Sequence, residues 1–179
     1  MSQNEKSLIK TLHILSAGLW LGASASVVLL QCLKGWSEDS RELSALNLNF
    51  SLLDYALIIP GAVGSLLTGF WICKRTNWGF LRYWWVIVKW ISTLSGIVVG
   101  SALLGPWQMQ MVKLSNLLVL SPAASLAYGQ IRILFTLVGA LQVLLLIFII
   151  GISVRKPWGK RLVKQKEVKT LKQNAEGVL

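Results

Sequence analysis

Four long apolar blocks constrain what this chain can fold into more than any other feature. They run roughly over residues 8–33, 52–73, 83–104 and 130–154. Each block reaches or exceeds the ~20 residues that an α-helix needs to cross the hydrocarbon core of a bilayer. Because lipid cannot hydrogen-bond to an exposed backbone, such blocks cross as helices. We therefore expect an all-α fold, a four-helix transmembrane bundle over residues 1–158, followed by a basic cytoplasmic tail over residues 159–179.

The charge of the chain points to a membrane surface as its partner. Hydrophobic residues make up 54% of the sequence and charged residues 14%, and the net charge is +11. A soluble domain has about 25% charged residues. Most basic residues flank the apolar blocks or fill the tail, a pattern typical of contact with anionic lipid headgroups. We expect these headgroups, and no nucleic acid, to be the partner of the tail.

The distribution of Lys and Arg predicts the topology. The N-terminus carries Lys6 and Lys10, the segment between the second and third blocks carries three basic residues, and the chain from Arg155 onward carries eight. The other two connections together hold only Lys34, Arg41 and Lys113. Basic residues prefer the cytoplasmic side, so we expect a bacterial inner-membrane protein with both termini in the cytoplasm. The triplet at residues 23–25 resembles a signal-peptide cleavage site, but the apolar run continues beyond it, which favours a retained first span.

The connections on the outer side contain helix-start signals. Ser37 precedes acidic residues and can cap a short helix over Ser37–Glu42. The segment Gly105–Gly129 is expected to lie outside the membrane, with a helix start at Ser121-Pro122 because proline suits the first helical position.

Each apolar block carries its polar residues on a stripe of small residues. These stripes follow three- and four-residue spacing, which places their members on one helix face. Small and polar faces pack inside membrane bundles, whereas aliphatic faces meet lipid. In block order the stripes are His13, Ser16, Ala17, Trp20 and Ser24; Asp54, Gly61, Ser65, Thr68 and Gly69; Lys89, Ser92, Thr93, Gly96 and Gly100; and Arg132, Thr136, Gly139 and Gln142.

The single histidine and one lysine are the main candidates for function. His13 and Lys89 each lie a few residues into a span from the cytoplasmic side, which at 1.5 Å per residue places both roughly 8–9 Å deep. We therefore expect them to form one ligand-binding site, with Trp20 on the same stripe as a further contact. Two structural alternatives remain: Lys89 extends to the interface, and His13 bonds to a neighbouring helix. An intramembrane cation otherwise indicates a functional site.

A haem group is a second interpretation of His13. A neutral imidazole can ligate iron, or it can join Lys89 in holding an acidic headgroup or a porphyrin propionate. Because the chain has one histidine, two histidines of the same chain cannot ligate one haem. Such ligation would need a homodimer or a different second ligand, so the cofactor remains open.

Two further pairs have their own interpretations. Asp54 and Arg132 have opposite charges and similar depths near the outer ends of their spans, which predicts an interhelical ion pair. Met109 and Met111 form a weak copper(I) signal, since thioethers suit that ion but no third ligand is near. Cys32 and Cys73 lie near opposite ends of different spans, so we expect no disulfide between them.

Four stretches resemble a family of bacterial predicted integral membrane proteins of unknown function. The matching stretches are LHILSAGLWLG (Leu12–Gly22), PGAVGSLLTG (Pro60–Gly69), PWQMQMVKL (Pro106–Leu114) and RKP (Arg155–Pro157). More distantly, the chain is similar to CopD-type copper-resistance proteins and to HemJ-type membrane protoporphyrinogen oxidases. The HemJ resemblance makes His13, Trp20, Pro60 and Lys89 the counterpart residues and implies a porphyrin ligand.

The sequence supports no phosphate loop, serine–histidine–aspartate set or carboxylate pair. We expect a non-enzymatic membrane protein that binds a partner protein, a second copy of itself or an amphipathic ligand in the inner leaflet. The alternatives are a haem-, porphyrin- or quinone-linked redox protein, and a transporter of copper or another metal.

Overall fold

The fold is known from a computed structural model, which describes residues 3–34, 37, 39–76, 79–117 and 122–158. Its elements are α1 (Gln3–Lys34), α2 (Ser40–Leu53), the π-helix η1 (Asp54–Ile58), α3 (Ile59–Arg75), α4 (Trp84–Val99), the π-helix η2 (Gly100–Leu104), α5 (Gly105–Ser115) and α6 (Pro122–Arg155). The expected tail, residues 159–179, lies outside the described residues.

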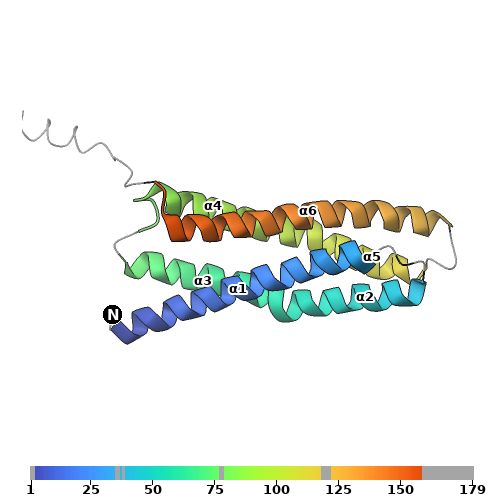
Figure 1. The fold of residues 1–179 in the computed structure, drawn as a ribbon, viewed down its shortest axis with the longest axis horizontal. Helices are drawn as coiled ribbons and strands as arrows, with labels where there is room; N and C mark the ends of the chain where they lie inside the picture. Colours follow the sequence, from blue (N-terminus) through green and yellow to red (C-terminus); the bar gives the residue numbers. More distant parts are fainter. Residues whose placement is uncertain (1–2, 35–36, 38, 77–78, 118–121, 159–179) are drawn as a thin grey trace, which may run out of the picture.

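These elements form four rods that alternate in direction (Figure 1). The rods are α1, α2–η1–α3, α4–η2–α5 and α6, and each contains a helix long and apolar enough to cross a membrane. The all-α four-helix prediction is therefore confirmed. The start of α1 and the end of α6 lie at the same end of the bundle, which we call the N-terminal end (Figure 1).

The two middle rods are longer than the apolar blocks predicted. The second rod begins at Ser40, and the third continues as a helix through α5 to Ser115. That the segment from Gly105 onward lies outside the membrane stays a prediction. Buried polar contacts hold these extensions: Gln108 Nε2 donates to Asn47 O at 2.8 Å, and Asn47 Nδ2 donates to Tyr128 Oη at 3.0 Å. Hydropathy cannot detect helices stabilised in this way. The predicted start of the last helix at Pro122 is confirmed.

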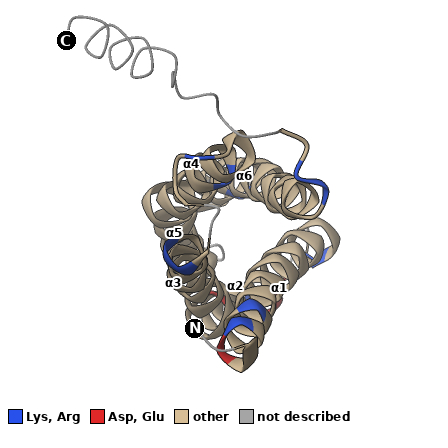
Figure 2. Cartoon of the chain, turned by 90° about the vertical axis from the view of Figure 1, so that its left-hand side faces the viewer, with Lys and Arg blue, Asp and Glu red and all other residues tan. Residues whose placement is uncertain are grey.

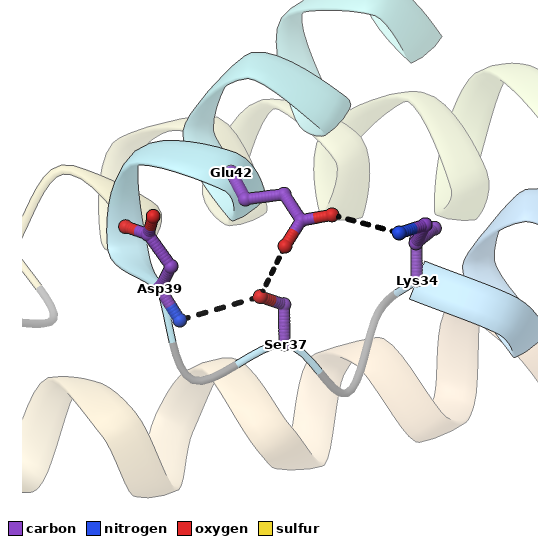
Figure 3. A network of polar contacts seen from close by, with 4 residues as sticks. All are labelled: Lys34, Ser37, Asp39 and Glu42. Atoms are coloured by element: carbon purple, nitrogen blue, oxygen red, sulfur yellow. Dashed lines mark hydrogen bonds and ion pairs between the residues drawn. The ribbon is translucent and has the colours of Figure 1, made fainter.

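Asp39 caps α2, whereas Ser37 was the expected cap (Figure 3). Asp39 Oδ1 accepts from Arg41 N at 2.9 Å, which satisfies a free amide of the first turn. Ser37 Oγ instead accepts from Asp39 N and donates to Glu42 Oε2 at 2.6 Å, while Lys34 Nζ pairs with Glu42 Oε1 at 3.2 Å. This network ties the end of α1 to the start of α2.

Two prolines explain the π-helices. Proline has no N–H and its ring collides with the carbonyl four residues earlier, so an α-helix cannot continue undisturbed through Pro60 or Pro106. The turn before each proline is widened instead: Ile59 N donates to Asp54 O, and Gly105 N donates to Gly100 O, both five residues back. The widening keeps both rods continuous, and π-turns of this kind occur often at functional sites.

The burial pattern of α4 matches the predicted faces. Thr93 and Gly96 of the small polar stripe are buried, whereas the aliphatic face is exposed at Ile91, Leu94 and Val98. An exposed aliphatic face on a long apolar helix is the surface expected to meet lipid.

Candidate functional site

The contact between α1 and α3 positions the candidate site. A Cβ added to Gly61 would lie 2.7 Å from Trp20 N and 2.9 Å from Ser16 O, so the two backbones touch there. Three residues further along α3, a Cβ on Gly64 would lie 2.6 Å from Ser16 Oγ. Glycines at these positions let the helices approach closely enough for side chains of α1 to reach polar groups on α3.

His13 is held against α3 by a hydrogen bond to Thr68. His13 Nδ1 lies 2.9 Å from Thr68 Oγ1, and the Thr68 hydroxyl donates its proton to Gly64 O one turn earlier. A hydroxyl has one proton, so Thr68 Oγ1 must accept from His13. The hydrogen therefore resides on Nδ1 of the imidazole, and Nε2 carries the lone pair.

Lys89 of α4 completes the network from the other side of His13. Lys89 Nζ lies 3.1 Å from His13 Nε2. An ammonium group can only donate, so it donates to the lone pair that the Thr68 contact leaves on Nε2. The resulting order is Lys89 to His13 to Thr68 to the Gly64 carbonyl, which links α1, α3 and α4 through a neutral imidazole. The structure thus brings together the two residues that depth alone had paired.

In the part of the chain that the structure describes, the charge of Lys89 has no carboxylate opposite it. Within the described ranges, no Asp or Glu forms an ion pair with Lys89, and the His13 ring contributes a lone pair without a charge. Lys89 is half-buried and can offer further N–H groups beyond the one bound to His13. The site can therefore accept an anion.

Comparison with known protein families shows which family this chain belongs to. The profile of the DUF2269 family, described as predicted integral membrane proteins, matches residues 7–157. The chain belongs to the DUF2269 family. No curated protein and no solved structure matches it. The family is of unknown function, so the activity of this DUF2269 protein has to be argued from its own residues.

Trp20 lies in the core of the DUF2269 chain. It is 3% exposed and packs with Ala62, Leu146 and Ile149, while its ring edge lies beside Gly96 of α4. This position makes Trp20 a packing residue two helical turns along α1 from His13. Its expected contact with a ligand stays a prediction.

Both ring nitrogens of His13 are already in hydrogen bonds, which bears on the haem interpretation. Nδ1 bonds to Thr68 and Nε2 bonds to Lys89. An iron atom at Nε2 would have to displace the Lys89 ammonium. The arrangement therefore suits hydrogen bonding better than iron ligation.

The other predicted pairs are placed as follows. Met111 is fully buried in the core and Met109 is 56% exposed, so the structure does not bring the two thioethers together. The reason is their spacing, since residues two apart in a helix point to nearly opposite faces. Cys32 and Cys73 are both free thiols, as expected. Asp54 begins η1, whereas Arg132 is a buried residue of α6, and their ion pair stays a prediction.

Sequence reasoning missed the roles of Thr68 and of the buried amides Asn47 and Gln108. Thr68 belongs to the predicted polar stripe of α3, but periodicity does not predict that it accepts a hydrogen bond from His13. A threonine in a helix often donates its hydroxyl proton to the carbonyl four residues earlier, here that of Gly64. The oxygen of such a threonine is then left to accept a hydrogen bond from another side chain.

Proposed function

We propose that this protein is a non-enzymatic inner-membrane protein that binds an anionic amphipathic ligand at Lys89 and His13. The observation that carries this proposal is the 3.1 Å contact between Lys89 Nζ and His13 Nε2, in which a cation is held by an uncharged acceptor. The ligand would present a carboxylate or a phosphate to Lys89 and an apolar chain to the surrounding lipid.

Charge compensation supports this choice of ligand. A charged side chain inside the membrane is costly unless an opposite charge or water accompanies it. His13 stabilises the position of Lys89 but does not compensate its charge. An acidic headgroup would accept charge-assisted hydrogen bonds from the remaining N–H groups, each contributing about 1.5–3 kcal/mol.

The distribution of basic residues supports the proposed side of the membrane from which the ligand reaches Lys89. Lys6 and Lys10 near the start of α1, Lys74 and Arg75 in the last turn of α3, and Arg155 in the last turn of α6 all lie at the N-terminal end of the bundle, which Figure 2 views end-on. Because basic residues favour the cytoplasmic side, this end faces the cytoplasm in our proposal and the ligand enters from the inner leaflet. Anionic lipids of that leaflet are the most abundant candidates and would also contact the basic tail.

The binding of two lipids that differ only in headgroup charge tests the proposal. Native mass spectrometry in an uncharged detergent would compare phosphatidylglycerol with phosphatidylcholine of the same acyl chains. Lys89→Met keeps most of the side-chain volume and removes the charge. We expect it to weaken the preference for phosphatidylglycerol about tenfold, which corresponds to ~1.4 kcal/mol.

Lys74→Met provides the matched control. Lys74 is an exposed lysine of the last turn of α3, at the same end of the bundle. This variant should change the preference less than twofold. Equal effects of the two substitutions would mean that only general surface charge attracts the lipid, and the proposal would be wrong.

A further inference from the structure

A second polar site lies deeper in the bundle, away from His13 and Lys89. A cavity of about 60 Å³ lies between the two π-helices and is also lined by residues of α1, α2, α5 and α6. Its polar lining includes Ser24, Asp54, Gln108 and Gln142. A space of this size can hold a few water-sized groups.

Two buried side chains in the cavity wall have acceptor atoms without partners. Gln108 is 5% exposed and Gln142 is 7% exposed, and among the described residues the Oε1 atom of each has no hydrogen-bond partner. The orientation of the Gln108 amide is fixed, because its Nε2 must donate to the Asn47 carbonyl at 2.8 Å. A buried oxygen without a hydrogen-bond donor destabilises the fold, so an occupant that binds acceptors is expected.

The π-helices bring the remaining groups to this cavity. Asp54 and Gly100 are the first residues of η1 and η2, and both line the cavity. Gly100 has no side chain, which leaves room for Gln142, whose Nε2 lies 3.6 Å from where a Cβ would be. One acidic residue and two glutamines, whose Oε1 atoms have no partner among the described residues, therefore line the same cavity from three rods.

We propose that this cavity binds a small monovalent cation, held by the Asp54 carboxylate and the amide oxygens of Gln108 and Gln142. Each of the three residues carries an acceptor oxygen, and the carboxylate disfavours an anion and favours a positively charged occupant. One carboxylate balances one positive charge. Divalent Ca²⁺ takes 6–8 oxygen ligands with several carboxylates, and Mg²⁺ uses carboxylates with bound water, so a single carboxylate fits a monovalent ion better.

Thermal stability in different salts tests the cation site. The full-length protein in an uncharged detergent would be heated in Na⁺, K⁺ or NH₄⁺ chloride, against N-methylglucamine chloride at the same ionic strength. A ligand that binds only the folded state raises the melting temperature. We expect at least one small cation to raise it and the bulky N-methylglucamine ion to have no such effect.

Substitutions in the cavity wall test whether the cation-dependent rise in melting temperature arises at this cavity. Asp54→Asn and Gln142→Leu should each abolish the cation-dependent rise. Asp39→Asn is the matched control, because asparagine is an equally good helix cap and Asp39 lies outside the cavity. Direct binding of radioactive ²²Na⁺ or ⁸⁶Rb⁺ to the wild type gives a second readout that does not depend on the stability of a variant.

The outcomes are distinct. A cation effect in the wild type and Asp39→Asn, absent in Asp54→Asn, supports the site. No cation effect and no bound tracer in the wild type would mean that water alone fills the cavity or that Arg132 neutralises Asp54, and would overturn the proposal. A cation effect that persists in Asp54→Asn would place binding elsewhere and overturn it as well. None of these results depends on the lipid preference at Lys89.

Discussion

Lys89 Nζ donates to the Nε2 lone pair of His13 across 3.1 Å, so the only histidine of the chain acts as an acceptor for an intramembrane cation. The Thr68 hydroxyl fixes this role, because it accepts the Nδ1 proton and passes its own proton to Gly64 O. A histidine held in this way joins three helices and leaves the positive charge of Lys89 available to a ligand.

Removal of the His13 ring should destabilise the bundle without unfolding it. His13→Ala loses two hydrogen bonds, each contributing about 1 kcal/mol, so we expect a loss of about 2 kcal/mol. The measurement is the free energy of unfolding in mixed micelles. Ser26→Ala is the control, since it removes an exposed hydroxyl bonded to Gly22 O on the same helix. It should change stability by less than ~0.5 kcal/mol. Equal losses in the two variants would contradict the network.

The contact between α1 and α3 should not tolerate a methyl group at Gly61. In Gly61→Ala the new Cβ would meet the backbone of Trp20 and Ser16, which cannot rotate away. We expect a loss of about 3 kcal/mol, at the upper end of overpacking effects. The same unfolding measurement gives the result.

Gly18→Ala is the counterpart of this variant on α1. A Cβ at Gly18 would have nothing within 4 Å, so it should add helix propensity and leave stability unchanged or raised by up to ~1 kcal/mol. A large loss at Gly18 with none at Gly61 would contradict the described packing.

The stripe pattern and the depths of His13 and Lys89 were sufficient to predict which helix faces point inward and which two residues meet. Both predictions rest on helix periodicity and on rise per residue, which tertiary packing leaves unchanged. The ends of the two middle rods were not predictable from hydropathy, because Asn47 and Gln108 are polar yet buried against each other. The predicted cap at Ser37 was also wrong, because α2 begins at Ser40 and Asp39 is the residue that caps it.

The π-helices had a sequence signal that hydropathy does not use. Pro60 and Pro106 each stand four residues after an alanine followed by leucine, in ALIIP and ALLGP, well inside an otherwise continuous helix. A proline in such a position predicts a kink or a widened turn. What the sequence could not reveal is that the two turns face one cavity, because that depends on how the rods pack.

The topology gives a prediction that uses introduced cysteines. The two native cysteines are first removed by Cys32→Ala and Cys73→Ala. Two separate variants of this cysteine-free protein, Lys34→Cys and Lys74→Cys, then each carry one thiol, near opposite ends of the bundle. With both termini in the cytoplasm, a membrane-impermeant maleimide should label Lys34→Cys in spheroplasts and Lys74→Cys only after permeabilisation. The reverse labelling pattern would contradict the proposed orientation.

The hydrogen bonds of His13 also give a spectroscopic prediction. Because both ring nitrogens are engaged, protein purified from native membranes should show no Soret band that depends on His13. Absorption spectra of the wild type and His13→Ala provide the measurement. A band in the wild type that disappears in the variant would assign His13 to a haem and favour the redox interpretation.

The most direct measurement is the protonation state of His13 by ¹⁵N NMR of histidine-labelled protein in nanodiscs. The chain has one histidine, so the spectrum contains a single imidazole to assign. At neutral pH we predict a neutral ring protonated at Nδ1, with an Nε2 resonance that shifts in Lys89→Met. A ring protonated at Nε2, or at both nitrogens, would mean that Lys89 does not donate to His13 and would contradict the account.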